Sequence, residues 1–260
     1  MTVRVYFEVA RLSFRRFSTY RQAVVAGVFT NTVFGFILAS VLRTAIGTRT
    51  IGGLTASTAT AFTFLGQGML MVVMAFGDFD ELEKVRSGEV ATALMRPLDY
   101  SAFRLASDLG RSLFNAFARG VPPFVVGWLV YRFPLAAPAR FLSFLILVVL
   151  AAVVASRWWN IVSTLAFWMT DGSGAMQLGV VVSTFATGSI IPLQFLPDGL
   201  KAVVRLTLWA AMVQRPVEVF IGIGAAWRCA LLQVGWIALL ETVLRVEFRC
   251  ARRKLVIQGG

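Results

Sequence analysis

Histidine is absent from this chain of 260 residues, and cysteine and lysine are scarce. Without histidine the chain lacks the commonest general base and metal ligand, which excludes a Ser/His/Asp hydrolase site. We expect the two cysteines, Cys229 and Cys250, to be free thiols because they lie far apart in the predicted topology. None of the three lysines follows a glycine, which excludes the Gly-Lys-Ser/Thr of a P-loop. We therefore expect no catalytic residues, bound metal or cofactor in this chain.

Charge of either sign is also sparse. Only 15% of the residues are charged and 58% are hydrophobic, with a mean hydropathy of +0.76. Soluble domains usually have about 25% charged and about 45–50% apolar residues. Several continuous apolar runs approach or exceed the roughly 20 residues that cross a hydrocarbon core. The sequence therefore predicts an all-α membrane protein with several spans.

The net charge of +12 comes mainly from arginines that cluster at the ends of apolar runs. This pattern is typical of membrane orientation and argues against a nucleic-acid partner. Six spans with both termini in the cytoplasm place 14 Lys and Arg residues on the cytoplasmic side and eight on the other. That excess favours the six-span topology. No repeat relates the two halves of the chain, which disfavours an inverted-repeat secondary transporter.

A single transmembrane domain is predicted over 1–260. Within 1–21, apolar residues recur every three or four positions with arginines between them, as in a helix that lies in the membrane interface. The predicted segments are an amphipathic interfacial helix (1–21), spans 1 and 2 (22–76), a cytoplasmic coupling segment (77–104), spans 3 to 5 (105–191), an outer amphipathic segment that is re-entrant or interfacial (192–220), span 6 (221–244) and a basic cytoplasmic tail (245–260).

Charged residues inside the predicted spans are few. Asp108 and Arg111 lie three positions apart in span 3, and we expect them to pair on one helix face. Arg119 lies deeper in the same span and needs protein, water or an opposite charge around it. In span 4, the run from Arg157 to Asn160 is interpreted as an interfacial aromatic belt with a snorkelling arginine.

The segment 77–100 holds six of the thirteen acidic residues and lies between long apolar runs. A charged, helix-forming segment in that position has to lie outside the bilayer. Ser87 and Gly88 interrupt it, and Pro97 disfavours helix at the residue before it. The segment therefore predicts two short amphipathic helices joined by a glycine hinge, with an unstructured solvated loop as the alternative.

Within this segment, SGEV at 87–90 is followed four residues later by MRPLD at 95–99. This pattern resembles the inner-loop signature of bacterial ABC type-2 (ABC-2) permeases, which are six-helix membrane subunits of ABC exporters. The stretches at 166–168, 188–193 and 195–197 are similar to the same family in order and spacing. The resemblance covers nearly the whole chain, and its most specific part is the Arg-Pro-Leu-Asp sequence.

The resemblance implies a permease subunit of an ATP-driven exporter in the bacterial cytoplasmic (inner) membrane. A separate ATP-binding subunit, in two copies, would hold ATP and Mg and act on the helix between spans 2 and 3. A second permease chain, identical or paralogous, would complete a path built largely from spans 1, 2 and 5. The substrate expelled would be a small molecule, a drug-like compound or a lipid-like compound.

Carried onto this sequence, the resemblance places the coupling surface at six residues and the turn into span 3 at three more. The coupling surface would consist of Asp80, Glu81, Glu83, Arg86, Gly88 and Glu89. The turn would be fixed by Arg96, Pro97 and Asp99.

Polar and soft apolar side chains mix in spans 1 and 2, as a path for drug-like or lipid-like compounds requires. The candidate path residues are Thr30, Asn31, Phe34, Thr63, Gln67 and Met71. Ordinary helix packing explains these residues at least as well. Two other functions stay open: an ATP-independent channel or secondary carrier, and a structural membrane anchor for a partner.

Overall fold

The computed structural model describes residues 2–74, 77–87, 89, 98–169 and 172–252, and that part of the chain is helical apart from turns and one isolated bridge between Ile51 and Leu54. Four of its helical segments are long and apolar enough to cross a membrane: Arg21–Ile46, Tyr100–Tyr131, Pro138–Phe167 and Ala226–Cys250. The elements are α1 (Thr2–Ser18), α2 (Arg21–Ile46), α3 (Ala56–Val72), α4 (Phe79–Arg86), α6 (Tyr100–Asn115), η1 (Ala116–Gly120), α7 (Val121–Tyr131), α8 (Pro138–Thr164), η2 (Leu165–Phe167), α9 (Ser173–Ala186), η3 (Leu193–Phe195), α10 (Asp198–Val204), α11 (Leu208–Met212), α12 (Gln214–Ile221) and α13 (Ala226–Arg252).

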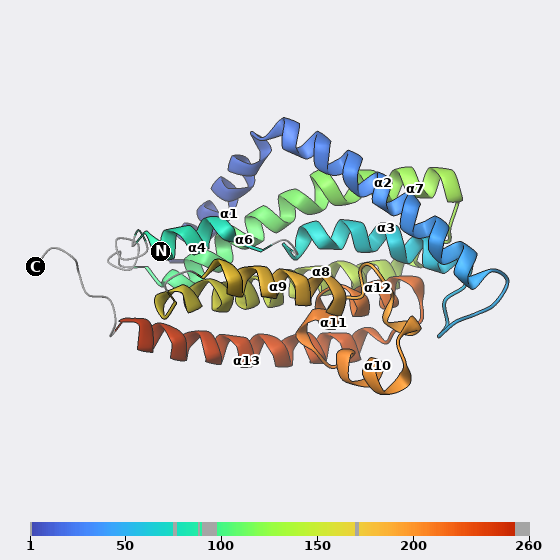
Figure 1. The fold of residues 1–260 in the computed structure, drawn as a ribbon. Coiled ribbons are helices and arrows are strands. Elements are labelled where there is room, and N and C mark those ends of the chain that lie inside the picture. The colour runs from blue at the N-terminus through green and yellow to red at the C-terminus, as the bar shows by residue number, and fades with distance from the viewer. Residues whose placement is uncertain (1, 75–76, 88, 90–97, 170–171, 253–260) are drawn as a thin grey trace, which may run out of the picture.

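The long helices lie side by side along one axis of the molecule (Figure 1). The start of α1, α4, the start of α6 and the end of α13 gather at one end, which we call the α4 end. The loop after α2, the end of α7 and the short helices α10 and α12 lie at the opposite end, which we call the α10 end. The first and last described helices therefore share an end with the charged segment, as the predicted topology requires.

Two of the six predicted spans are shorter than a bilayer crossing. Helix α3 has 17 residues and α9 has 14, whereas a crossing takes about 20. The apolar runs are longer than these helices because each ends in a turn: Met74 and Gly188 have φ angles of 53° and 75°. The described part of the chain thus has four helices of membrane length and two shorter apolar ones, and six spans remain a prediction.

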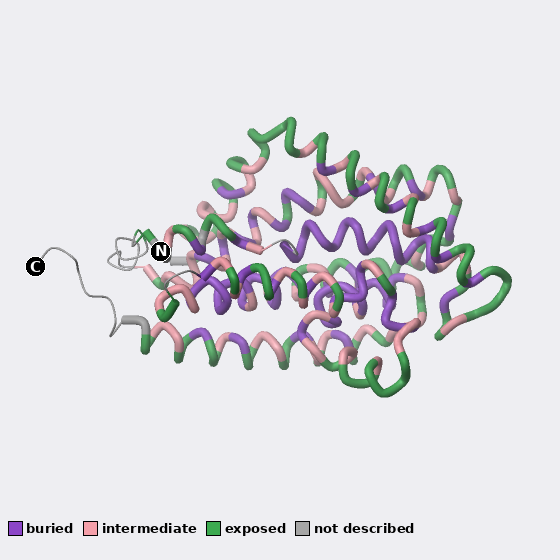
Figure 2. The backbone as a smooth tube through the Cα atoms, in the orientation of Figure 1, coloured by how far each residue is buried: buried purple, intermediate pink, exposed green. Residues whose placement is uncertain are grey.

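Helix α3 runs through the middle of the bundle. Every residue from Ala59 to Val72 is buried, and its trace is purple along nearly its whole length (Figure 2). It packs against α2, α7, α8 and α12. The largest hydrophobic cluster joins it to α8, α9, α11, α12 and α13. Because α3 is enclosed by protein, its hydroxyl-rich start does not need to satisfy a lipid environment.

Glycines bring the helices around α3 close together. The ring of Phe64 fills space that a Cβ atom at Gly35 in α2 or at Gly127 in α7 would occupy. One turn further along α3, the backbone of Gly68 contacts that of Gly120 in η1. Small residues of this kind let membrane helices approach closely. The crossing of α3 with η1 therefore depends on glycine from both sides.

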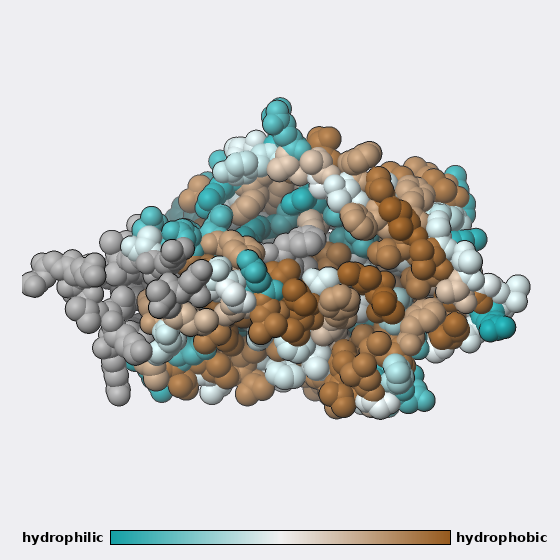
Figure 3. Space-filling model, viewed as in Figure 1, coloured by the Kyte–Doolittle hydropathy of each residue, from teal (hydrophilic) through white to brown (hydrophobic). Residues whose placement is uncertain are grey.

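The outward faces of α2 and α9 are apolar. In α2, Phe29, Phe34 and Val41 are exposed, and in α9, Leu178 and Phe185 are exposed. Apolar surface gathers over both helices in the space-filling view (Figure 3). Exposed apolar faces on helices of this kind are suited to lipid or to another membrane chain.

Several predicted boundaries need correction. Span 3 starts within α6 and is interrupted by the π-helical turn η1. Span 6 does not begin at residue 221: Gly222, with a φ of 86°, ends α12, and α13 begins at Ala226. The predicted basic tail continues α13 as helix to Arg252. The segment 192–220 holds four short helical elements at the α10 end, because Pro192, Pro197 and Pro216 each favour a new start.

Candidate functional site

A buried carboxylate lies at the start of the charged segment. Asp78 directly precedes α4, and only 2% of its side chain is exposed. Arg104 donates a hydrogen bond to it at 2.5 Å, and Arg111 forms an ion pair with it at 3.2 Å. The two arginines are two helical turns apart on one face of α6. Burial alone would raise the pKa of Asp78, but the two guanidinium groups and their hydrogen bonds hold that pKa well below its usual range.

A second carboxylate, Asp108, completes an alternating arrangement with the same arginines. Its Oδ1 lies 3.7 Å from Arg104 and 3.6 Å from Arg111. On its other side, Ser156 of α8 donates a hydrogen bond to Oδ2 at 2.7 Å. Asn160, one turn further along α8, accepts a hydrogen bond from Arg104 at 3.1 Å. The two carboxylates and the two guanidinium groups therefore balance in charge. With their contacts to Ser156 and Asn160, they connect the residue before α4 to α6 and α8.

We call these six residues the ion network: Asp78, Arg104, Asp108, Arg111, Ser156 and Asn160. The predicted pairing of Asp108 with Arg111 is confirmed, but sequence reasoning missed Asp78 and Arg104. One signal was available, since Arg104 and Asp108 are four positions apart and such residues face each other on a helix. No spacing rule could connect Asp78 to α6, because that contact spans 26 positions.

The interpretation of the run in span 4 as an interfacial belt is wrong for Arg157 and Trp159. Trp159 is only 1% exposed, and its indole donates a hydrogen bond to the carbonyl of Val73 at 3.1 Å. Arg157 is buried, with an ion pair to Glu241 of α13 at 3.1 Å and a hydrogen bond to Ser101 at 2.8 Å. Both side chains point between helices because α13 and the end of α3 cover that side of α8. The periodicity of residues within α8 could not predict that α13 and the end of α3 pack on this side.

Helix α4 contacts the bundle at Leu82. Leu82 is buried in the main hydrophobic cluster, and α4 packs against α8, η2 and α9. Asp80, Glu83 and Glu89 are exposed. The side-chain surroundings of Glu81 and Arg86, both in α4, lie outside what the structure describes. An acidic, exposed surface therefore lies at the α4 end, and Leu82 attaches it to the hydrophobic core.

Part of the predicted coupling set lies outside the described residues: Gly88, Arg96 and Pro97. The second predicted helix falls largely in the same part of the chain, and of it only Glu89 is described. Asp99 is described, and its Oδ1 accepts a hydrogen bond from the backbone of Ala102 at 2.8 Å. Asp99 thus caps the start of α6 and satisfies a donor that the helix leaves free.

The six candidate path residues fall into two groups. Thr30 and Phe34 lie on the exposed face of α2. The other four are buried: Asn31, Thr63, Gln67 and Met71. The hydroxyl of Thr63 is used within α3, where it bonds to the carbonyl of Ala59 at 3.0 Å. In the single chain, these residues do not share one open surface.

Both cysteines are free, with Cys229 buried and Cys250 exposed. No cluster of three potential metal ligands among His, Cys, Asp and Glu occurs within the ranges that the structure describes.

The sequence was compared with known protein families and with curated proteins. A family model described as ABC-2 family transporter protein matches residues 29–259. Comparison with curated proteins gives no match. The matched region includes all six residues of the ion network and extends through α13. Members of this family are membrane subunits that work with an ATP-binding subunit and are generally not catalytic themselves. The chain belongs to the ABC-2 family of transporter proteins and is a multi-pass membrane permease subunit of an ABC transporter.

Proposed function

We propose that this chain is the permease of an ATP-driven exporter and that α4, with the residues that follow it, receives the movement of a separate ATP-binding subunit. The observation that carries this proposal is the position of Asp78. It directly precedes α4, and it is bound to two arginines of a membrane-length helix. A displacement of α4 therefore acts on α6 through ionic contacts and not through a loose linker.

The contacts continue from α6 into the rest of the bundle. Asp108 connects α6 to α8 through Ser156. Arg157 connects α8 to α13 through Glu241. Removing one partner of a buried ion pair costs about 3–5 kcal/mol, so these links resist separation when α4 is pushed. We infer that closure of the ATP-binding subunits tilts α6, α8 and α13 together.

The exposed acids of α4 favour a partner with a basic surface. Asp80 and Glu83 are exposed on this helix, and Glu89 is exposed just beyond its end. We expect basic side chains of the ATP-binding subunit to face these three acids, joined by Glu81, Arg86, Gly88 and the turn at Arg96 and Pro97. Electrostatic complementarity of this kind fixes the orientation of a complex and speeds its formation. Two copies of that subunit would hold ATP and Mg²⁺, and no cofactor would bind to the permease itself.

We further propose that the α4 end faces the cytoplasm of a bacterium, with both termini on that side of the inner membrane. A second permease chain, identical or paralogous, would cover the exposed apolar face of α2. Thr30 and Phe34 would then line a shared path, with Asn31 behind them. The buried residues Thr63, Gln67 and Met71 would reach that path only when the helices tilt. The exported substrate would be a small molecule, drug-like or lipid-like.

Co-purification with the ATP-binding subunit tests the coupling assignment. The double variant Glu83→Arg with Glu89→Arg reverses two charges on the proposed surface and leaves the ion network untouched. We expect it to insert normally but to lose the ATP-binding subunit and transport. The control is Asp198→Arg, which alters an exposed acid at the α10 end and should keep both. An intact complex with undiminished transport in the double variant would refute the coupling surface. Flux in proteoliposomes without ATP would favour a channel or secondary carrier.

A further inference from the structure

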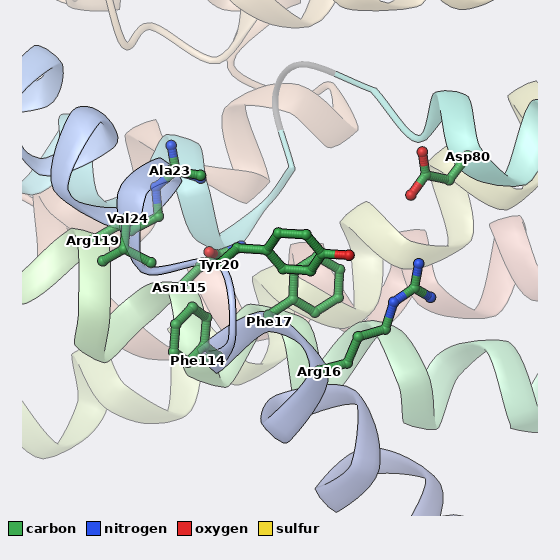
Figure 4. Close-up of a pocket in the computed structure, with 9 residues that line it drawn as sticks. All are labelled: Arg16, Phe17, Tyr20, Ala23, Val24, Asp80, Phe114, Asn115 and Arg119. Atoms are coloured by element: carbon green, nitrogen blue, oxygen red, sulfur yellow. The ribbon is translucent and has the colours of Figure 1, made fainter.

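A pocket of about 220 Å³ lies where α1 turns into α2. It is lined by the elbow between these helices, by the end of α6 with η1, and by Asp80 of α4. Arg119 lies at one end of the pocket beside Ala23 and Val24, and Asp80 lies at the other end beyond Arg16 (Figure 4). The rings of Phe17 and Tyr20 lie between these ends (Figure 4). The pocket is therefore apolar and aromatic over most of its length, with a cation at its inner end.

Arg119 is the unusual member of this set. Its Nε is buried and has no hydrogen-bond partner, and no ion pair of its guanidinium occurs among the residues that the structure describes. The guanidinium lies against Gly27 of α2, where a Cβ atom would overlap it. Gly27 is six residues inside α2, or about 9 Å along the helix from its start. A charge at membrane depth normally faces a partner charge, protein or water, and no opposite charge pairs with this one in the part of the chain that the structure describes.

The backbone that carries Arg119 is also unusual. Residues Ala116–Gly120 form a π-helical turn, and such turns occur frequently at functional sites. A second donor without a partner, the Nδ2 of Asn31, is buried one helical turn beyond Gly27 on the same face of α2. Both unsatisfied groups are donors. The ligand that would satisfy them is an acceptor, and beside a guanidinium an anionic one is favoured.

The surroundings indicate what kind of anion fits. The pocket lies between the end of α1 and the start of α2, the level at which a helix of membrane length enters the bilayer. The apolar side chains of Phe7 and Leu12 on α1 are 67% and 58% exposed, so the outer neighbour of this elbow is lipid. A phosphate that enters from there has to be attached to an acyl chain. Arginine binds phosphate through two parallel N–H donors, and the flanking rings suit the region between headgroup and chain.

We propose that this elbow pocket binds the phosphate group of a phospholipid from the membrane leaflet at the α4 end, with Arg119 as its principal contact and Arg16 at its rim. Phe17 and Tyr20 pack against the lipid's glycerol and first methylenes. Asp80 is kept from the phosphate by its place at the far end of the pocket. The site requires the membrane location of the chain and is independent of coupling to an ATP-binding subunit.

Purified full-length chain in a neutral detergent provides the test. The probes are dioleoyl phosphatidic acid, dioleoyl glycerol, which has the same chains without the phosphate, and inorganic phosphate. Lipid retention is measured by native mass spectrometry, and the unfolding temperature by a thermal scan. We expect phosphatidic acid to be retained and to raise the unfolding temperature, whereas the other two probes do neither at equal concentration.

The variant Arg119→Gln should weaken the apparent affinity for phosphatidic acid at least about tenfold, as expected for loss of a charged hydrogen bond. Its unfolding temperature without lipid should not fall, because Arg119 forms no ion pair with the residues that the structure describes. A purely structural arginine would give the opposite result. A second variant, Ala23→Trp, fills the pocket from the exposed start of α2 without removing a charge, and it should also abolish retention.

The control Arg228→Gln removes an exposed arginine at the start of α13, and it should bind as the unaltered chain does. Two outcomes would overturn the proposal. One is retention of phosphatidic acid by Arg119→Gln and Ala23→Trp at the affinity of the unaltered chain. The other is stabilisation by inorganic phosphate equal to that by phosphatidic acid, which would assign the site to a free anion.

Discussion

Asp78 and Arg104 form a buried ion pair at 2.5 Å that joins the residue before α4 to the second turn of α6. The pair closes a loop of 26 positions that contains nearly all of the charged segment. Arg111 adds a second contact from the same face of α6. The charged segment is thus bound to a membrane-length helix at its entry, and it returns into that same helix at Asp99.

The variant Asp78→Asn should destabilise the permease strongly. It leaves Arg104 and Arg111 buried with one carboxylate between them, and the loss of one partner in such a site costs about 3–5 kcal/mol. We expect a clearly lower unfolding temperature in detergent. The control Asp198→Asn alters an aspartate that is 96% exposed, and it should change stability little. Equal unfolding temperatures for the two variants would contradict the importance assigned to the ion network.

Low pH should weaken the ion pair of Asp78 with Arg104. Because the pKa of Asp78 is lowered in the folded state, its stabilising contribution is fully present above the ordinary carboxyl pKa of about 3.9. It is lost as the pH falls from that value through the lowered pKa. Stability should therefore be insensitive to this group from neutral pH down to about pH 5. Thermal scans of the unaltered chain and Asp78→Asn should converge as the pH falls below about 4, and a gap that stayed constant would exclude this cause.

The link between α6 and α8 can be measured as a coupling energy. Ser156→Ala and Asp108→Asn each disturb the 2.7 Å hydrogen bond between these residues. Because they share that bond, the double variant should lose less stability than the sum of the two single losses, by roughly 0.5–3 kcal/mol. A double-mutant cycle from chemical or thermal unfolding gives this difference. Strict additivity would mean that the two side chains do not interact.

Helix α1 should move away from α6 when space between them is filled. A Cβ atom at Gly110 would overlap the backbone carbonyl of Ala10, and the hydroxyls of Ser13 and Ser107 lie 3.4 Å apart nearby. In a chain without its native cysteines, Ser13→Cys with Ser107→Cys should form a disulfide on mild oxidation.

Adding Gly110→Val to that pair should greatly reduce the yield of disulfide on a denaturing gel. The matched control is Gly174→Val, because a Cβ atom at Gly174 would meet open space. Equal disulfide formation with Gly110→Val would show that α1 tolerates the larger side chain without displacement.

The burial of Arg157 and Trp159 in α8 shows a limit of prediction from sequence patterns. Apolar runs and arginine clusters predicted helices, their approximate places and the charged segment between them. Arg157 and Trp159, however, have the same local pattern whether they face headgroups or other helices. Arg157 is buried against α13, which begins almost 70 residues later, and Trp159 is bonded to Val73 at the end of α3, 86 positions earlier. Only the packing of the whole bundle could therefore assign them.

The sequence alone determined that this is a helical membrane chain of the ABC-2 family, because hydropathy and the inner-segment motif are local properties of the sequence. It also located the acidic segment and the pairing of Asp108 with Arg111, since residues three apart on a helix are neighbours by geometry. Only the tertiary structure decided that Asp78 and Arg104 complete this network and that Arg119 lacks an ionic partner among the described residues. Those contacts join segments far apart in the chain, and their formation depends on how closely the helices approach one another.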